Sequence, residues 1–565
     1  MTKVEDLKYE RYTLEQFKAA VEPQIAALES AETFDKLMKA REEIIKAQGT
    51  FSTMAALANM RYTINTRDEY YVGEVEYYDN VSPIANEIMA RYSNALLGSK
   101  FKDKLEKKTS PALIKSLENQ RAAASPKITE DRQKEAAIVM EYSKLMSTMP
   151  FELFGKTMPL SMVRGYLSDN DRAVRRDAAF AIGNGLAKHR DELDDIYDRL
   201  VKIRTGMGKK LGFENYIPLG YLNMDRKDYD RSDVESFRRG VEKYLVPVVS
   251  ELKKKLQADL GIDRFMFYDN GITLSGGETR PKLGAKEMFE AAQNMYDELD
   301  PEVGDFMRFM QETEAFDVEA RDGKWGGGYC TEFHDYKQPF ILANWNGSCD
   351  DVDVLTHEFG HAFAGMNAMK NGIFELGVGG METAECHSMT MEMMCHPYMD
   401  KFFGEDADKY RYRHLLKNID FIPYGSIVDE FQHVIYENPT LTPKQRNDVF
   451  KDLTEKYMPY MTYDGIPYLE EGTRWQYQMH IYESPFYYID YCLAQTVALE
   501  FYAESLKNYD DALRRYIAFA KKGGSKMFKT LVSEAGLVSP FAPDALKKVA
   551  EVGLKKLTEL KKRIK

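Results

Sequence analysis

Apolar side chains spaced three and four residues apart run through most of this chain and leave little room for any fold except a helical one. From residue 1 to about residue 270 the segments are rich in Ala, Leu, Glu, Lys and Arg, and turn signals such as Ser168-Asp169-Asn170 separate them. The same pattern returns at residues 286–314 and from residue 350 to the C-terminus. We therefore expect a mainly α fold.

Two stretches interrupt this pattern and predict a minor β component. Turn-forming residues alternate with short β-prone runs around residues 265–280, where we expect a small sheet to begin. Farther along, the apolar run over residues 339–345 predicts a strand. Because Pro339 cannot donate a backbone hydrogen bond, its place at the start of this run favours an edge strand.

The length and composition are those of a globular protein with more than one core. The chain has 565 residues, of which 44% are hydrophobic and 30% are charged. Its formal net charge of -13 would repel a phosphate backbone, so we expect no nucleic-acid partner.

Three features predict a cytoplasmic protein that does not enter membranes. The N-terminal stretch carries Lys3, Glu5, Asp6 and Lys8 instead of the apolar core of a signal peptide. We find no run of about 18 apolar residues that could span a bilayer. The cysteines are odd in number, widely spaced and without a CxxC pair, which suits reduced thiols.

One helix of about five turns is predicted between the turn at Asn346-Gly347 and the signal at Asn371-Gly372, with Ser348 and Asp351 spaced as a capping box. His357 and His361 lie one turn apart on a shared face of this helix. That face points away from a stripe of apolar residues that we expect to be buried, namely Val352, Leu355, Phe359, Ala362 and Met366.

Residues 357–361 form the HExxH pattern on this helix. Two imidazoles one turn apart can bind one Zn²⁺, and the carboxylate of Glu358 can take a proton from water at the metal. The alternative is a pair of histidines packed in the core, which chance would rarely produce in this pattern. We therefore predict one Zn²⁺ per chain, with His357 and His361 as ligands and Glu358 as general base.

A catalytic zinc usually has a third protein ligand. The metzincin pattern is excluded because Ala364 and Asn367 occupy the positions of its glycine and third histidine. The thermolysin spacing fails as well, because the positions for its Glu hold Gly380 and Met381. Spacing alone leaves four carboxylates open, each of which could also be an ordinary solvated charge: Glu375, Glu382, Glu385 and Glu392.

Residues 356–363 and 383–392 resemble the oligoendopeptidase F and thimet oligopeptidase family of zinc peptidases. Residues 327–331 and 344–347 extend the match, and the chain length resembles the shorter bacterial oligoendopeptidase F type. The resemblance implies that Glu385 is the third zinc ligand.

Two further acidic residues acquire supporting roles from this resemblance. Glu392 follows Glu385 by two turns on the same helix face. Asp353 precedes His357 by one turn, where the family also has an acidic residue, and it could accept the ring N–H and fix the tautomer. The alternative for Asp353 is an ordinary exposed residue in the first turn of the helix.

Residues 480–491 are similar to the family's His and Tyr segment. Ser484 before Pro485 predicts a helix start, which places Tyr488 and Tyr491 on one face. By this resemblance His480, Tyr488 and Tyr491 are catalytic donors to a developing oxyanion, and which tyrosine is the main donor is left open. Without it, the segment would be an aromatic core stripe.

The family's fold implies a multi-helical, zincin-like ellipsoid with a small sheet beside the active-site helix and a deep cleft. We expect an N-terminal helical region over residues 1–200 and a catalytic region over residues 201–565. The predicted edge strand would pair with an extended substrate, and this region supplies the substrate-binding candidates Gly328, Tyr329, Ala343 and Asn344.

The function implied is hydrolysis of internal bonds in short peptides. A zinc carboxypeptidase of similar helical fold is the nearest alternative, and a basic residue for the terminal carboxylate would distinguish it. A peptide-binding scaffold without turnover and a nonenzymatic helical interaction protein are the others, although Glu358 argues against a pure binder. Neither the oligomeric state nor the preferred side chains follow from the sequence.

Overall fold

The computed structural model describes residues 2–371 and 373–564, and its fold is mainly helical, as predicted. The first helices are α1 (Leu14–Glu29), α2 (Phe34–Ile64), α3 (Glu69–Gly98), α4 (Lys102–Lys108), α5 (Pro111–Ala123), α6 (Thr129–Thr148), α7 (Leu160–Gly165), α8 (Arg172–Ala187), α9 (Arg190–Lys210), α10 (Ile217–Asn223), α11 (Arg231–Gly240) and α12 (Val246–Asp259). They are followed by α13 (Ala285–Leu299), α14 (Pro301–Glu312), α15 (Asp350–Asn371), α16 (Met381–Met394), α17 (Asp400–Phe403), α18 (Ala407–Glu437), α19 (Pro443–Tyr457), α20 (Met479–Glu483), α21 (Tyr488–Ser505), α22 (Tyr509–Lys522), α23 (Phe528–Glu534) and α24 (Ala545–Arg563).

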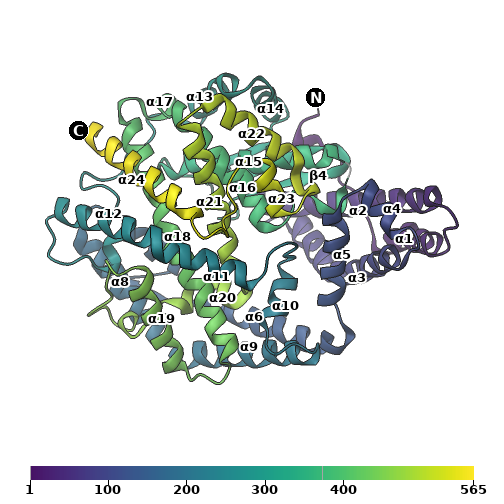
Figure 1. Ribbon diagram of the computed structural model, residues 1–565, viewed down its shortest axis with the longest axis horizontal. Helices are drawn as coiled ribbons and strands as arrows, with labels where there is room; N and C mark the ends of the chain where they lie inside the picture. Colours follow the sequence, from purple (N-terminus) through teal and green to yellow (C-terminus); the bar gives the residue numbers. More distant parts are fainter. Residues whose placement is uncertain (1, 372, 565) are drawn as a thin grey trace.

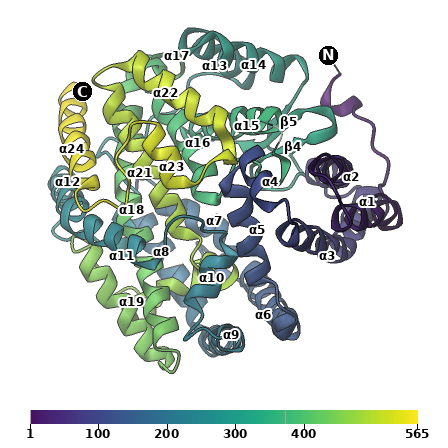
Figure 2. The same cartoon turned by 45° about the vertical axis from the view of Figure 1, so that its right-hand side comes forward.

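The helices divide into an N-terminal group and a larger body around α15 and α16. In both views, α1 to α3 lie at one end of the molecule, on the right (Figures 1 and 2). Helices α15, α16 and α21 pack on one another in sequence, and α24 returns along α18. None of the described helices is long and apolar enough to cross a lipid bilayer.

A three-stranded sheet lies against α15, with β4 (Tyr329–Phe333) at one edge and β3 (Phe316–Glu319) at the other. Strand β5 (Gln338–Trp345) is the middle strand, parallel to β3 and antiparallel to β4. The edge position predicted for residues 339–345 is therefore wrong. Pro339 is tolerated because it pairs only with β4, and the pairing with β3 starts at Ile341.

The sheet expected around residues 265–280 is also absent from the described residues, where Phe267–Asp269 form a short 3₁₀ turn. The carboxylate of Asp269 accepts hydrogen bonds from Arg172 and Arg175 of α8, which hold this turn on the helix. A two-stranded hairpin, β1 (Phe151–Leu153) with β2 (Lys156–Met158), occurs instead at a place where only helices were expected.

Helix α15 is anchored by the apolar stripe that the sequence predicts, and all five of its residues are buried. Phe359 stacks on Tyr296 of α13 with ring centroids 4.0 Å apart, and it also contacts Phe306 of α14 at 5.4 Å. Near the start of α15, the Asp351 carboxylate accepts from the backbone N–H groups of Asn346 and Gly347. Gly372, part of the predicted end signal, lies outside the described residues.

Candidate metal centre and active site

Helices α15 and α16 bring the three predicted zinc ligands together. His357 and His361 project from α15, and Glu385 faces them from the first turns of α16. One oxygen of Glu385, Oε2, lies 3.4 Å from His357 Nε2 and 3.6 Å from His361 Nε2. One ligand atom from each residue falls within a cluster in which all separations are below 4.8 Å.

This arrangement fits zinc. Ligand atoms about 2 Å from a tetrahedral Zn²⁺ are separated from one another by roughly 3.3 Å, close to the two distances that Glu385 makes. Burial would raise the pKa of Glu385, but its hydrogen bond with His357 and the charge of that imidazole lower it. The pKa of His361 falls to about 4 through burial and the charge of His357, so this imidazole is neutral, as a ligand must be.

A second carboxylate fixes the orientation of His357. Glu392 Oε1 accepts from His357 Nδ1 at 2.6 Å, which leaves Nε2 directed at the cluster. Glu392 Oε2 accepts from His414 Nε2 at 2.7 Å, and His396 Nε2 donates to His414 Nδ1 at 2.8 Å. The tautomer of His357 is thus set by a chain of buried groups on α16, on the 3₁₀ turn His396–Tyr398 and on α18.

Asp353 does not make the contact that the sequence suggested for it. Its carboxylate accepts from Tyr410 at 2.6 Å and from Arg413 at 2.8 Å, both on α18. Asp353 therefore ties α15 to α18, and the contact to the ring N–H of His357 belongs to Glu392.

Glu358 lies between the two histidines in a largely desolvated position. Burial raises its pKa above the ordinary value, and the charges of Glu385 and Glu392 add to the shift, although His357 opposes it. A carboxylate with a raised pKa is a stronger proton acceptor than a solvated one. The residue therefore stays the predicted candidate for the general base.

The His and Tyr segment also lies beside the predicted ligands, and Tyr487, which was not among the predicted donors, joins the predicted Tyr491 there. The ring of Tyr487 lies 4.9 Å from that of Tyr491 and 5.6 Å from that of His480. Burial raises the pKa of both Tyr487 and Tyr491, and the charge of Glu385 contributes to each shift, so both phenols lie near the metal ligands. Burial lowers the pKa of His480, which keeps the ring neutral.

Tyr488 packs against α18 as well as against His480. Its ring contacts Phe421 at 5.5 Å and Tyr424 at 5.8 Å, and after burial its pKa is raised mainly by Tyr424. The ring also lies 4.9 Å from His480. Helix α21 begins at Tyr488 rather than at Ser484, because Phe486 has a left-handed φ of 67° that turns the chain before the helix.

The four substrate-binding candidates lie on two neighbouring strands. Gly328 and Tyr329 lead into the edge strand β4, and the Tyr329 hydroxyl shares a hydrogen bond with Thr63 of α2 at 2.6 Å. Ala343 is buried in β5, and its carbonyl accepts from Lys324 Nζ at 2.6 Å. Asn344 Nδ2 donates to the carbonyls at residues 325 and 327, so it shapes the loop before β4.

Several residues that the sequence did not predict contact the predicted ligands and donors or position them. Ser388 donates to Glu385 Oε2 at 3.2 Å, and its position three residues after that ligand was a usable signal. Tyr487 is the neighbour of a predicted donor, but the helix start had been placed too early to show its direction. His414 gave no local signal, because it lies on another helix.

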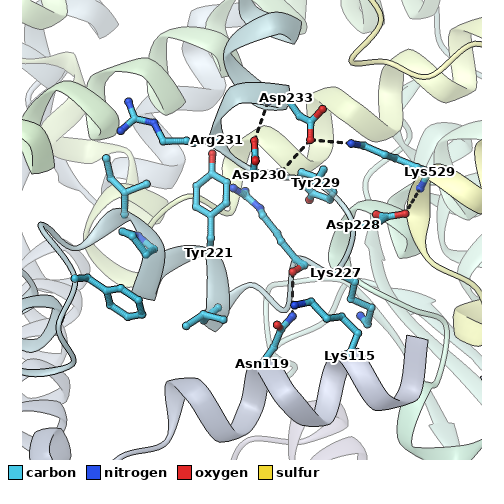
Figure 3. Close-up of a pocket in the computed structure, with 15 residues that line it drawn as sticks. Lys115, Asn119, Tyr221, Lys227, Asp228, Tyr229, Asp230, Arg231, Asp233 and Lys529 are labelled. Atoms are coloured by element: carbon cyan, nitrogen blue, oxygen red, sulfur yellow. Dashed lines mark hydrogen bonds and ion pairs between the residues drawn. The ribbon is translucent and has the colours of Figure 1, made fainter. Parts of the chain in front are cut away.

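A separate cavity of about 610 Å³ lies between α5 and the segment from α10 to α11 (Figure 3). Its charges largely pair with one another: Lys529 Nζ lies 2.8 Å from Asp233, and the Lys529 backbone N–H donates to Asp228 at 2.9 Å. Arg226 lies in its wall and pairs with Asp490 of α21 at 3.1 Å. None of the predicted site residues lines this cavity.

Two family models match the chain. The model of peptidase family M3 matches residues 165–551, and that of the peptidase M3 N-terminal domain matches residues 4–124. The boundary expected at residue 200, which falls within α9, stays a prediction.

Individual relatives point the same way. Oligopeptidase PepF of Bacillus subtilis is 25% identical over 426 residues, which are 71% of this chain and 59% of that protein. An oligoendopeptidase F homolog of Borreliella burgdorferi is 24% identical over 64% of this chain and 61% of its own length. The match thus spans less than two thirds of either relative.

Solved structures match over the whole chain. The structure of PZ peptidase A with inhibitor 2 is 39% identical, covers 100% of both chains and has a TM-score of 0.91. Oligoendopeptidase F from Enterococcus faecium, at 15% identity and a TM-score of 0.62, covers 98% of this chain and shows the fold alone. These findings confirm the resemblance that the sequence motifs indicated.

Proposed function

Because the chain belongs to peptidase family M3, we propose that it is a zinc-dependent endopeptidase that hydrolyses internal bonds of short peptides. The observation that carries this proposal is the position of Glu385 Oε2, at near-tetrahedral spacing from both histidine Nε2 atoms. Glu358 lies between these histidines on the same helix. The names of the relatives, oligopeptidase and oligoendopeptidase F, support peptide substrates.

His357, His361 and Glu385 would hold the metal. When bound there, Zn²⁺ supplies Lewis-acid chemistry, which acidifies water and polarises a carbonyl group. One zinc per chain is proposed on the donor set of two imidazoles and one carboxylate, which suits this ion.

The chain's own residues would divide the proton and charge transfers among them. Glu358 takes a proton from the attacking water and delivers it to the leaving amine, a role supported by its raised pKa. The phenols of Tyr487 and Tyr491 and the ring of His480 donate to the oxygen on which negative charge develops. Tyr488, whose ring packs on Tyr424, would hold the neighbouring Tyr491 in place through ring contacts.

Strand β4 would hold the peptide in an extended conformation. It is the edge strand next to α15, so its free backbone groups can pair with a substrate, which the central strand β5 cannot do. Main-chain pairing ignores side chains and favours broad specificity. This moves the substrate-pairing role from residues 339–345 to residues 329–333 and keeps Gly328 and Tyr329 as contact candidates.

A cytoplasmic location is part of the proposal. All five cysteines are free, although four of them are buried, which is consistent with a reducing compartment. The net charge of -13 supports peptides rather than nucleic acid as partners.

Two buried cations beside α16 and α21 are already paired with carboxylates, so neither offers a site for the terminal carboxylate that a carboxypeptidase would bind. Lys227 pairs with Asp225 at 2.7 Å, and Arg226 pairs with Asp490 at 3.1 Å, so each is already neutralised. A carboxypeptidase would need such a cation free to bind the terminal carboxylate. A peptide-binding scaffold would have no use for the desolvated Glu358.

The proposal is tested by product analysis together with a metal assay. A ten-residue peptide is offered with both ends blocked and with a free C-terminus, products are identified by mass spectrometry, and zinc is measured in the purified protein. We expect one zinc per chain and internal fragments from the blocked peptide. If only the peptide with a free C-terminus is cleaved, and it loses its C-terminal residues one at a time, the protein is a carboxypeptidase. If peptides bind but no products form, the protein is a peptide-binding scaffold.

A further inference from the structure

An acidic side chain without a partner lies one helical turn beyond the predicted metal ligands. Glu332 projects from β4, and within residues 2–371 and 373–564 no hydrogen bond or ion pair reaches its carboxylate. Burial raises the pKa of Glu332 to about 7, with no neighbouring charge contributing. Desolvating a carboxylate without pairing it is unfavourable, so an unpaired carboxylate at this position suggests a role in binding.

Helix α15 leaves space for this carboxylate. A Cβ atom added at Gly365 would lie 2.1 Å from Glu332 Oε1, so only glycine fits there while Glu332 keeps its place. Glycine within a helix is unfavourable relative to alanine, so its presence here has a cost in stability. Gly365 follows His361 by one turn on the same face, which places the carboxylate next in line along the helix.

Glu332 also lines a cavity of about 570 Å³, a volume typical of ligand sites. The cavity is open to solvent on one side and is lined by β4, the last turns of α15, residues 374–379 and α2. Glu375, in its wall, is already bonded to Arg41 at 3.0 Å and to Tyr92 at 2.7 Å. Asp335 is exposed, which leaves Glu332 as the partly buried, unpaired acid among the described residues that line this cavity.

The same face of β4 reaches the reaction centre. Cys330 precedes Glu332 by two residues, so both side chains lie on one face of the strand. Burial raises the pKa of the Cys330 thiol, and both Glu332 and Glu358 add to the shift, so the thiol lies near both carboxylates. A peptide extended along β4 from the general base would therefore bring a side chain or its terminus to Glu332.

We propose that Glu332 binds a cationic group of the substrate and selects peptides that carry this charge at a fixed distance from the scissile bond. The cation is an ammonium or guanidinium group, supplied by a Lys or Arg side chain or by a free N-terminus. This inference rests on the proposed peptidase function. A cation would favour the ionised carboxylate and complete the pair that the fold leaves open.

The test compares hydrolysis of matched peptides. Internally quenched ten-residue peptides, blocked at both ends, carry one Lys moved through successive positions, with an all-norleucine peptide as reference. A further norleucine peptide has a free N-terminus, which separates the two sources of charge. We expect the wild type to prefer Lys at one position, or the free terminus, by about 10- to 100-fold in kcat/KM, as expected for a charged hydrogen bond. Glu332→Gln should bring this ratio close to one.

Asp335→Asn is the matched control, because it removes an exposed acid from the same cavity and should keep the wild-type ratio. No preference in the wild type, or a preference that survives Glu332→Gln, would overturn the inference. Binding of the same peptides to Glu358→Gln, with and without Glu332→Gln, is measured by calorimetry. Peptides that bind with a Glu332-dependent preference but are never cleaved would support this inference while contradicting the proposed peptidase function.

Discussion

Single residues decide whether His357 presents the correct nitrogen to a metal. Glu392 accepts from the Nδ1–H of this histidine at 2.6 Å, and His414 holds Glu392 from the other side at 2.7 Å. Glu392→Gln should therefore weaken zinc binding by about 10- to 100-fold, because the amide can no longer hold the ring as a charged acceptor. Competition with a chromogenic chelator measures the affinity.

Asp353→Asn is the informative comparison, because this residue contacts Tyr410 and Arg413 and not His357. Its substitution should lower the free energy of unfolding, since Arg413 loses a charged partner, but change the zinc affinity much less than Glu392→Gln. A larger loss of zinc affinity in Asp353→Asn than in Glu392→Gln would contradict the assignment.

The tyrosines at the start of α21 lead to a second prediction at this scale. Tyr487 and Tyr491 lie near Glu385, whereas Tyr488 packs on Phe421 and Tyr424. Tyr487→Phe and Tyr491→Phe should each lower kcat, by up to about 100- to 1000-fold for the main oxyanion donor, with a small effect on KM. Tyr488→Phe should change kcat much less. If steady-state kinetics show the largest loss of kcat in Tyr488→Phe, the assignment of Tyr487 and Tyr491 as the donors is wrong.

A third prediction concerns stability and pH. Burial raises the pKa of Glu500 from its ordinary 4.5 to about 7 in the folded protein. The folded state therefore keeps a proton that the unfolded state releases, and stability falls as pH rises from about 4.5 to 7. The separation of the two pKa values corresponds to about 3 kcal/mol at pH 8.

Glu500→Gln removes this titration and can still accept the Val538 N–H that Glu500 Oε2 accepts at 2.8 Å. Denaturant unfolding at pH 5 and pH 8 should show the variant close to wild type at the lower pH and more stable at the higher one. A stability difference that does not grow with pH would show that folding does not raise the pKa of Glu500.

How far the sequence predicts single residues depends on whether the contact is local. His357, Glu358 and His361 share one helix, so spacing alone places them together. The choice of Glu392 over Asp353 depends on how α15 and α16 cross, which spacing within one helix does not determine. Tyr487 and Tyr488 are adjacent in sequence, and only the turn at Phe486 shows which one faces the ligands.

Between elements, the approach of α15 to α16 depends on one glycine of the HExxH segment. A Cβ at Gly360 would lie 2.7 Å from Ser388 Cα and 2.8 Å from the His387 carbonyl oxygen, both backbone atoms of α16. Gly360→Ala should therefore push α16 away and move Glu385 from the two histidines. We expect weaker zinc binding and a lower melting temperature, measured by chelator competition and calorimetry.

Gly206 of α9 is the matched control, since nothing lies within 4 Å of a Cβ added there. Gly206→Ala should leave zinc binding unchanged and stabilise the protein by up to about 1 kcal/mol, through helix propensity. Equal zinc affinity in Gly360→Ala and wild type would mean that the close contact does not position Glu385.

At the element scale, periodicity is a good guide to helices and a poor one to sheet order. The stripe on α15 is buried as predicted because a helix of this length must cover its apolar face. The order β3-β5-β4 depends on long-range pairing, and Pro339 misleads because it lies beyond the end of β3. The hairpin β1–β2 has three-residue strands, too short for a periodic signal.

Over the whole molecule, the N-terminal helices are tied to the body around α15 and α16 by buried polar contacts. Arg41 of α2 and Tyr92 of α3 both bind Glu375, which lies between α15 and α16. The side chain of Arg41 is only 4% exposed. Such pairs join positions more than 280 residues apart, so no local pattern predicts them.

The central claim is that Glu358 acts as general base at a zinc site built by α15 and α16. The most direct measurement is hydrolysis of a blocked, internally quenched peptide by wild type and Glu358→Gln, with zinc quantified in both proteins. We predict internal cleavage by the wild type and a loss of activity of several orders of magnitude in a variant that keeps its zinc. Full activity in zinc-loaded Glu358→Gln, or a wild type that cleaves with no zinc bound, would contradict the account.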